Sequence, residues 1–181
     1  KACGIKSGNI MPRILDATAG LGGDAFVLAS LGAELILCER NPIVRALLAD
    51  GLARARQADD QTALIAARMQ LLAEDSEQAL LRIAQGEPSD KPDIVFLDPM
   101  FPERRKASAA VKKGMTAFHS IVGTDDDQAK LLPLALAAAR ARVVVKRPQH
   151  APTLDGNPAP LVQTGESVRF DLYPLMSMAQ S

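Results

Sequence analysis

A strand that runs into a glycine-rich turn is the feature that most limits how this chain can fold. Residues 15–26 read LDATAGLGGDAF, an apolar start followed by a turn that contains Gly20, Gly22 and Gly23 and then by a helix-forming run. Glycine adopts the positive φ angles that such a turn requires, and it lets a ligand come close to the backbone. This arrangement is typical of the first strand and helix of a parallel α/β sheet with a ligand at its edge.

The turn fits two kinds of cofactor. Its G-x-G-x-x-A spacing matches the dinucleotide fingerprint, and Glu39 lies where a ribose-binding acid is expected. Asp24, in the first turn of the helix, would repel a pyrophosphate, and Asp16 adds a second negative charge before the turn. S-adenosylmethionine has no phosphate and carries a cationic sulfonium and an ammonium. The acids therefore favour S-adenosylmethionine, and NAD remains the alternative.

Length and composition indicate one domain that has no overall positive charge to attract nucleic acid. The 181 residues allow a single α/β domain, residues 1–181, and the formal net charge is zero. No apolar run is long enough for a membrane helix, no secretory signal is visible, and the two cysteines lack the spacing of metal ligands. We therefore expect a cytoplasmic protein that uses neither a membrane nor a metal. Because the chain begins at Lys1 without methionine, we expect a further segment before it.

Strands and helices alternate along the first 150 residues. This alternation predicts a Rossmann-like, doubly wound, mostly parallel sheet of about seven strands that ends in a C-terminal antiparallel hairpin. The expected strands are 14–17, 34–38, 69–72, 93–97, 142–146, 160–163 and 167–173, and the expected helices are 24–31, 42–56, 61–68, 76–84 and 127–141.

The fourth expected strand ends in an acid, a proline and an aromatic residue. Asp98 and the carbonyl of Pro99 can accept the hydrogens of an amino group, and Phe101 offers a face on which a base can stack, worth ~1–3 kcal/mol. Methyl transfer to a planar amine requires mainly alignment, which such a turn can provide. In the alternative interpretation, Asp98 and Pro99 only end the strand and Phe101 belongs to the core.

A basic segment follows this turn directly. It could bind RNA phosphates, or it could be an ordinary solvated loop. Its cations are Arg104, Arg105, Lys106, Lys112 and Lys113, and Lys146 and Arg147 extend from the fifth strand at the same edge of the sheet.

Several phrases together resemble one protein family over residues 14–173. The chain is similar to the bacterial small-subunit ribosomal RNA guanine-N2 methyltransferases, the RsmJ-like group of class I S-adenosylmethionine-dependent enzymes. The phrases are the glycine turn, Glu39-Arg40-Asn41-Pro42, Leu97-Asp98-Pro99-Met100-Phe101-Pro102, Val143-Val144-Val145-Lys146-Arg147-Pro148 and Arg169-Phe170-Asp171.

The resemblance implies an enzyme that methylates the exocyclic N2 amine of a guanine in small-subunit ribosomal RNA or in the small ribosomal subunit. It implies that Glu39 binds the ribose hydroxyls and that Asp75 accepts from the adenine amino group. The cofactor contacts that it implies are Gly23, Asp24, Glu39, Arg40, Asp75, Ser76 and Asp98. Similar acid-proline turns serve N-methyltransferases for DNA adenine N6 or protein glutamine, and a non-catalytic adenosine- or NAD-binding module is a further alternative.

Overall fold

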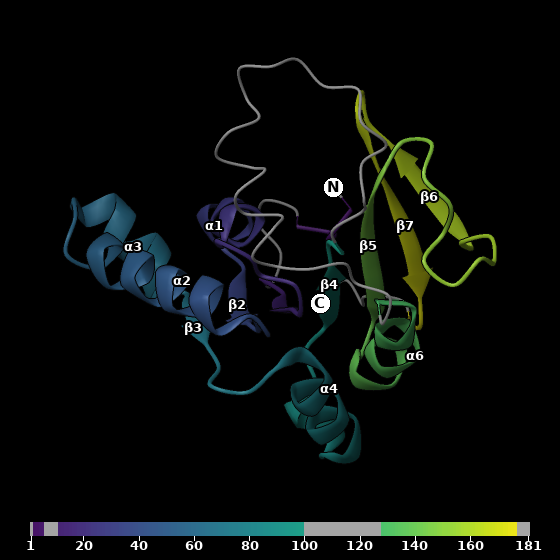
Figure 1. Ribbon diagram of the computed structural model, residues 1–181, viewed down its shortest axis with the longest axis horizontal. Coiled ribbons are helices and arrows are strands. Elements are labelled where there is room, and N and C mark those ends of the chain that lie inside the picture. Colours follow the sequence, from purple (N-terminus) through teal and green to yellow (C-terminus); the bar gives the residue numbers. More distant parts are fainter. Residues whose placement is uncertain (1, 6–10, 100–127, 177–181) are drawn as a thin grey trace.

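Seven strands form one sheet in the part of the chain that the computed structural model describes, residues 2–5, 11–99 and 128–176 (Figure 1). Their order across the sheet is β3-β2-β1-β4-β5-β7-β6. The first five strands of the chain are parallel, and β7 runs antiparallel to both β5 and β6. The strands are β1 (Arg13–Asp16), β2 (Glu34–Leu37), β3 (Met69–Leu71), β4 (Ile94–Leu97), β5 (Arg142–Pro148), β6 (Leu161–Thr164) and β7 (Val168–Pro174).

Helices cover both faces of this sheet (Figure 1). Alternate residues of each strand point to opposite faces, so Ile14 joins the core under α1, α2 and α3, whereas Leu15 joins the core under α4 and α6. The bounds are α1 (Gly23–Ser30), α2 (Pro42–Ala55), α3 (Asp60–Ala67), α4 (Ser76–Gln85), a 3-10 turn η1 (Pro88–Asp90) and α6 (Gln128–Ala138). None of the helices in the described ranges is long and apolar enough to cross a membrane.

Local sequence signals explain where helices begin. Asn41 accepts hydrogen bonds from the N–H groups of Ile43 and Val44, and Pro42 occupies the first helical position of α2. Asp75 caps α4 in the same way, by accepting from the N–H of Gln78. These caps set the start of each helix just after the strand that precedes it.

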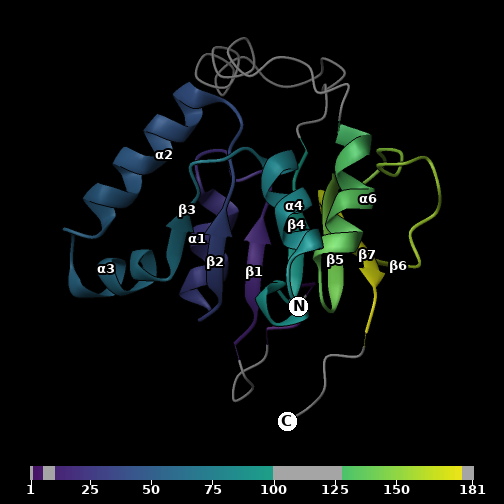
Figure 2. The ribbon, with the colours of Figure 1, turned by 90° about the horizontal axis from the view of Figure 1, so that it is seen from below.

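The sheet reverses its strand order between β1 and β4. Chain connections lead from β1 outward to β2 and β3, and then from β4 outward to β5. Figure 2 shows the arrowheads of β1, β2 and β3 pointing toward one common edge of the sheet. Ligands of doubly wound sheets bind at the carboxyl ends of the strands at such a switch point. The glycine turn after β1 and the acid-proline turn after β4 meet there.

The structure confirms the expected order of elements, and two boundaries differ from the expected ones by more than one residue. Helix α6 ends at Ala138 rather than at residue 141, because the N–H groups of Arg140 and Ala141 donate to the carbonyls of Pro92 and Asp93. Strand β5 extends to Pro148 rather than to residue 146, because β7 pairs with it along its whole length. Both changes come from contacts with distant segments.

Candidate functional site

The glycine turn has the backbone geometry that its sequence predicts. Gly20 and Gly22 have φ angles of 54° and 81°, in the left-handed region that favours glycine. At Gly22 a Cβ would also lie 2.8 Å from Cδ1 of Leu48, so a side chain does not fit without movement. At Gly23, the first residue of α1, a Cβ would meet no atom within 4 Å. The turn is therefore packed tightly beneath Gly22 and open beside Gly23.

Glu39 joins the glycine turn to the start of α2. One carboxylate oxygen, Oε2, accepts the N–H of Gly20 at 2.9 Å, and the other, Oε1, accepts the N–H of Asn41 at 2.8 Å. The residue is buried, with 8% of its surface exposed. Each oxygen can accept a further hydrogen bond. The contact between Glu39 and a ribose stays a prediction, and the structure adds a role in holding the turn.

A short chain of hydrogen bonds connects the ends of β1 and β4. Oδ1 of Asp16 accepts the N–H of Thr18 at 3.0 Å, and Oγ1 of Thr18 accepts the N–H of Asp98 at 2.6 Å. Asp16 is buried, and this burial raises its pKa to about 7. The nearby carboxylates of Asp24, Asp98 and Glu39 contribute to this rise. Thr18 was not among the predicted site residues, although its position two residues after Asp16, in the turn that follows β1, could have indicated it.

Lys146 lies between two carboxylates from other elements. Its Nζ donates to Oδ2 of Asp24 at 2.5 Å and to Oδ2 of Asp98 at 2.9 Å. Burial raises the pKa of Asp98, and the hydrogen bond and charge of Lys146 oppose that rise. Burial also disfavours the charged form of Lys146, but the hydrogen bonds to both aspartates outweigh it and raise the pKa of the ammonium. The structure thus places Lys146 inside the site.

The remaining predicted cofactor residues lie around the same edge. Asp75 is half-buried, and its Oδ1 is used in capping α4. The hydroxyl of Ser76 is buried and donates to the carbonyl of Ala17, so it ties the start of α4 to the turn after β1. Arg40 is exposed directly after Glu39. The contacts of these residues with a cofactor stay predictions.

Arg147 lies inside the protein rather than on its surface. Only 2% of its surface is exposed, and its Nε and Nη2 donate to the carbonyl of Pro152 at 3.1 and 2.6 Å. Arg169, its partner on β7, donates to the carbonyls of Gln149 and Ala151 and pairs with Asp171. The two arginines hold the segment after β5 against the sheet. A guanidinium buried in this way does not reach a phosphate, so we leave Arg147 out of the RNA contact.

Other predicted residues divide between the described and the undescribed parts of the chain. Pro99 is buried next to Asp98. Phe101 and the basic segment, comprising Arg104, Arg105, Lys106, Lys112 and Lys113, lie outside the described residues.

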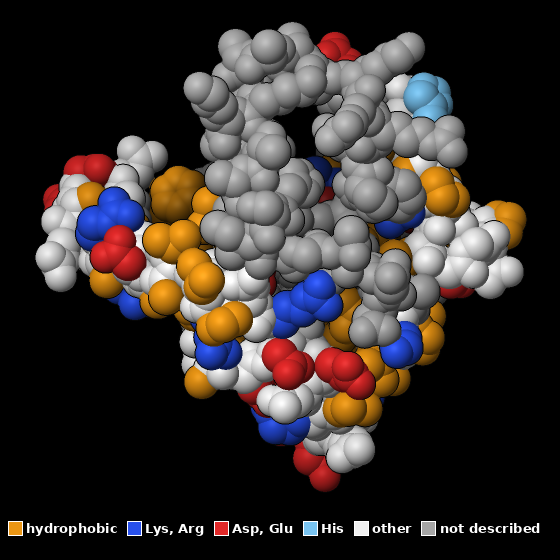
Figure 3. All heavy atoms as spheres, in the orientation of Figure 1, with side chains coloured by type: hydrophobic (Ala, Val, Ile, Leu, Met, Phe, Trp, Pro, Cys, Tyr) orange, Lys and Arg blue, Asp and Glu red, His pale blue; other side chains and the backbone are white. Residues whose placement is uncertain are grey.

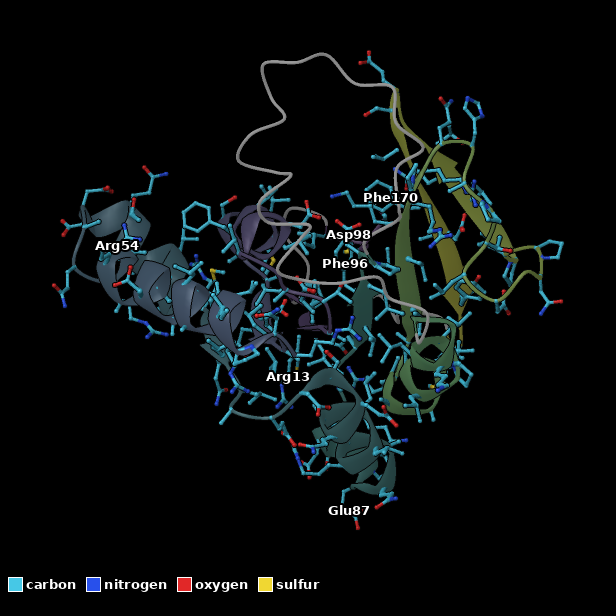
Figure 4. All side chains as sticks on the ribbon, viewed as in Figure 1. Arg13, Arg54, Glu87, Phe96, Asp98 and Phe170 are labelled. Atoms are coloured by element: carbon cyan, nitrogen blue, oxygen red, sulfur yellow. The ribbon has the colours of Figure 1, made fainter. Side chains whose placement is uncertain are left out.

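Phe170 was not among the predicted site residues. It stands opposite Lys146 in the pairing of β5 with β7. The two side chains therefore share a face of the sheet. In the view of Figure 4 the labelled residues Phe170 and Asp98 lie next to each other. The sequence carried no signal for this proximity, because it depends on the register of the strands.

The face of the molecule seen in Figure 3 carries charges of both signs. Lys and Arg side chains alternate with Asp and Glu side chains over its described part, and apolar side chains gather over α2. Within the described ranges, no three His, Cys, Asp or Glu side chains are grouped as metal ligands. The four acids at the carboxyl edge, Asp16, Asp24, Glu39 and Asp98, suit a cationic ligand better than a phosphate.

Comparisons with known proteins agree with this geometry. A family model described as "Putative SAM-dependent methyltransferase" matches residues 1–175. Ribosomal RNA small subunit methyltransferase J of Cellvibrio japonicus is 55% identical over 177 residues, which are 96% of this chain and 65% of that protein. The protein of the same name from Chromobacterium violaceum is 49% identical over 99% of this chain and 68% of its own length. The chain therefore spans about two thirds of the length of these curated relatives.

Solved structures show the same fold. A SAM-dependent methyltransferase from Neisseria gonorrhoeae superimposes with a TM-score of 0.70 at 41% identity, over 90% of this chain and 64% of that one. The rRNA methyltransferase aviRa from Streptomyces viridochromogenes gives a TM-score of 0.59 at 17% identity, over 96% and 80% of the two chains, and supports the fold alone. The sheet is thus the Rossmann-like sheet of class I methyltransferases, as predicted. The chain belongs to the family of S-adenosylmethionine-dependent methyltransferases that includes ribosomal RNA small subunit methyltransferase J.

Proposed function

We propose that the protein transfers a methyl group from S-adenosylmethionine to the exocyclic N2 amine of a guanine in small-subunit ribosomal RNA. The observation that carries this proposal is the position of Asp98. It stands at the carboxyl end of β4, its backbone is bonded to Thr18 of the glycine turn, and its side chain is bonded to Lys146. An acid held this firmly beside a cofactor turn can orient an amine for transfer.

The residues of the β4 turn supply alignment rather than strong base chemistry. The lone pair of a guanine N2 amine is delocalised into the ring, so the amine is a weak nucleophile. The carboxylate of Asp98 and the carbonyl of Pro99 accept its two hydrogens and favour a tetrahedral nitrogen. When bound, the cofactor supplies an activated methyl on a cationic sulfur, which becomes neutral as the methyl leaves. One proton of the methylated amine then passes to Asp98 or to water.

The acids of the carboxyl edge fit the proposed cofactor. We assign the ribose hydroxyls to Glu39 and the adenine amino group to Asp75. The negative charges of Asp24 and Asp98 favour the cationic methionine portion. Gly23, next to the open side of the turn, permits a close approach to the backbone.

We assign RNA binding to Phe101 and to the basic segment between Arg104 and Lys113. Stacking on Phe101 and charge on the five cations would supply affinity in this arrangement. The names of the relatives favour ribosomal RNA over DNA adenine or protein glutamine as the substrate. Because that RNA is found in the cytoplasm, the proposal places the protein there.

Mass mapping of ribosomal RNA tests the proposal. Small-subunit RNA from cells that lack the protein should have lost one methyl group from one guanine, and the wild-type gene should restore it. The Asp98→Ala variant should not restore it, whereas Asp50→Ala, which changes an exposed aspartate of α2, should. If RNA from the deletion cells carries every methyl group of the wild type, the proposed substrate is wrong.

A further inference from the structure

We propose that Lys146 is a positioning residue for the methyl transfer, which fixes the carboxylate of Asp98 and keeps it ionised. This inference rests on the proposed function. It replaces the sequence-based assignment of Lys146 to an RNA-binding surface.

Lys146 connects three separate elements of the site. Its ammonium, carried by β5, contacts Asp24 in the first turn of α1 and Asp98 after β4. The side chain of Lys146 is 23% exposed, against 39% for Asp24 and 38% for Asp98, so the cation is the most enclosed member of the cluster. An ammonium already paired with two carboxylates is less available to a phosphate backbone.

The sheet limits where this ammonium can go. Strand β5 is paired with β4 on one side and with β7 on the other, so its backbone is fixed on both edges. Phe170 stands directly across from Lys146 on β7 and packs against the core of the same face. With Phe170 beside it and α1 on the same face, the lysine stem is directed toward Asp98.

Two consequences follow for Asp98. The contact with Lys146 uses Oδ2, which leaves Oδ1 as the oxygen that we assign to the substrate amine.

The contact also places a positive charge in a group of negative ones, because Asp16 of β1, Asp24 of α1 and Glu39 after β2 surround the same edge. Without the ammonium, like charges and burial would favour the neutral acid. A protonated Asp98 accepts hydrogen bonds poorly and holds the amine less well.

The test is the pH dependence of turnover, measured under saturating cofactor and RNA with the protein in the full length that the cell makes. Lys146→Met removes the charge and keeps most of the stem. At neutral pH it should lower turnover about 10- to 100-fold. The acidic limb of its pH–rate profile should move to higher pH by about one unit or more, because Asp98 then binds its proton at a higher pH. Lys146→Arg keeps the charge, and should return the limb to its wild-type position.

A double variant separates this mechanism from a loss of structure. Asp24→Asn removes one of the like charges beside Asp98. Combined with Lys146→Met, it should therefore move the acidic limb back toward that of the wild type. RNA affinity and its salt dependence should be the same for Lys146→Met as for the wild type. Lys146→Gln repeats the test if the methionine variant does not fold.

The alternatives give different results. In one, Lys146→Met does not move the acidic limb of the pH–rate profile and instead reduces the slope of log RNA affinity against log salt concentration by about one. That result would mean that Lys146 contacts a phosphate. A uniformly lower turnover with the wild-type limb would mean a structural role. Either result overturns the inference while the wild-type protein still methylates ribosomal RNA. A wild-type protein that does not methylate this RNA would instead overturn the proposed function.

Discussion

The side-chain oxygen of Thr18 accepts the backbone N–H of Asp98 at 2.6 Å, across the junction between β1 and β4. Thr18 belongs to the turn that we propose binds the cofactor, and Asp98 belongs to the turn that we propose binds the substrate. This hydrogen bond, together with the contacts of Lys146 with Asp24 and Asp98, couples the two halves of the proposed site. We therefore expect the relative position of methyl donor and acceptor to depend on this junction.

Thr18→Val should impair turnover more than stability. Valine keeps the shape of threonine but leaves the N–H of Asp98 without this acceptor. We expect turnover to fall by about 10- to 100-fold, because a misplacement of about 1 Å has this effect. Single-turnover kinetics with saturating cofactor and RNA measure it. Thr18→Ser, which keeps the oxygen, is the matched control, and equal rates for both variants would contradict the coupling.

Glu39→Ala should weaken cofactor binding and loosen the glycine turn. The change removes the acceptor for the N–H groups of Gly20 and Asn41 as well as the proposed ribose contact. Calorimetry with S-adenosylhomocysteine should show a loss of about 1–3 kcal/mol, the range for a charged hydrogen bond. Glu34→Ala changes the exposed first residue of β2, the strand that precedes Glu39, and should leave affinity unchanged. If both variants bind like the wild type, Glu39 has no part in the site.

Gly22→Ala and Gly23→Ala should differ in stability although the two residues are adjacent. At Gly22 the added methyl meets Leu48 at 2.8 Å and the φ angle is 81°. We expect a loss of about 2–4 kcal/mol in the free energy of unfolding, from left-handed strain and overpacking together. Gly23 begins α1 and has open space around it, so alanine there should be neutral or stabilise by up to about 1 kcal/mol. Urea unfolding compares the two, and equal losses would argue against the observed packing.

Asp16 should make the folded protein less stable as the pH rises. Its pKa is raised from 3.8 to about 7 by burial, so the folded state binds this proton more tightly than the unfolded state does. The resulting stabilisation is fully present below about pH 4 and is lost as the pH rises toward 7, with a size on the order of 2–4 kcal/mol. Asp16→Asn cannot titrate and can still accept from Thr18.

The measurement for Asp16 is thermal unfolding without cofactor at pH 5 and at pH 8. The midpoint of Asp16→Asn relative to the wild type should be higher at pH 8 than at pH 5. A difference that does not change with pH would show that Asp16 is ionised in the folded protein throughout this range.

Local signals in the sequence determined the order and type of the elements. Asn41 and Pro42 favour a helix start through a side-chain cap and a preset φ angle, and the glycine turn after an apolar strand favours one in the same local way. The turn after β1 and the acid after β4 could be assigned to one edge, because parallel strands place their carboxyl ends together. This part of the site could be predicted because each turn is recognised from the hydrophobic periodicity of about 10 to 20 neighbouring residues.

The roles of Lys146 and Arg147 were decided only by the tertiary structure. The two residues are adjacent cations in the sequence, and from the sequence both were assigned to the RNA surface. Because side chains of a strand alternate between faces, one points toward α1 and reaches Asp24 and Asp98, whereas the other points to the opposite face and is buried beneath the segment after β5. Which residue faces which way depends on the register of β5 with β4 and β7, and that register is set by contacts between residues far apart in the chain.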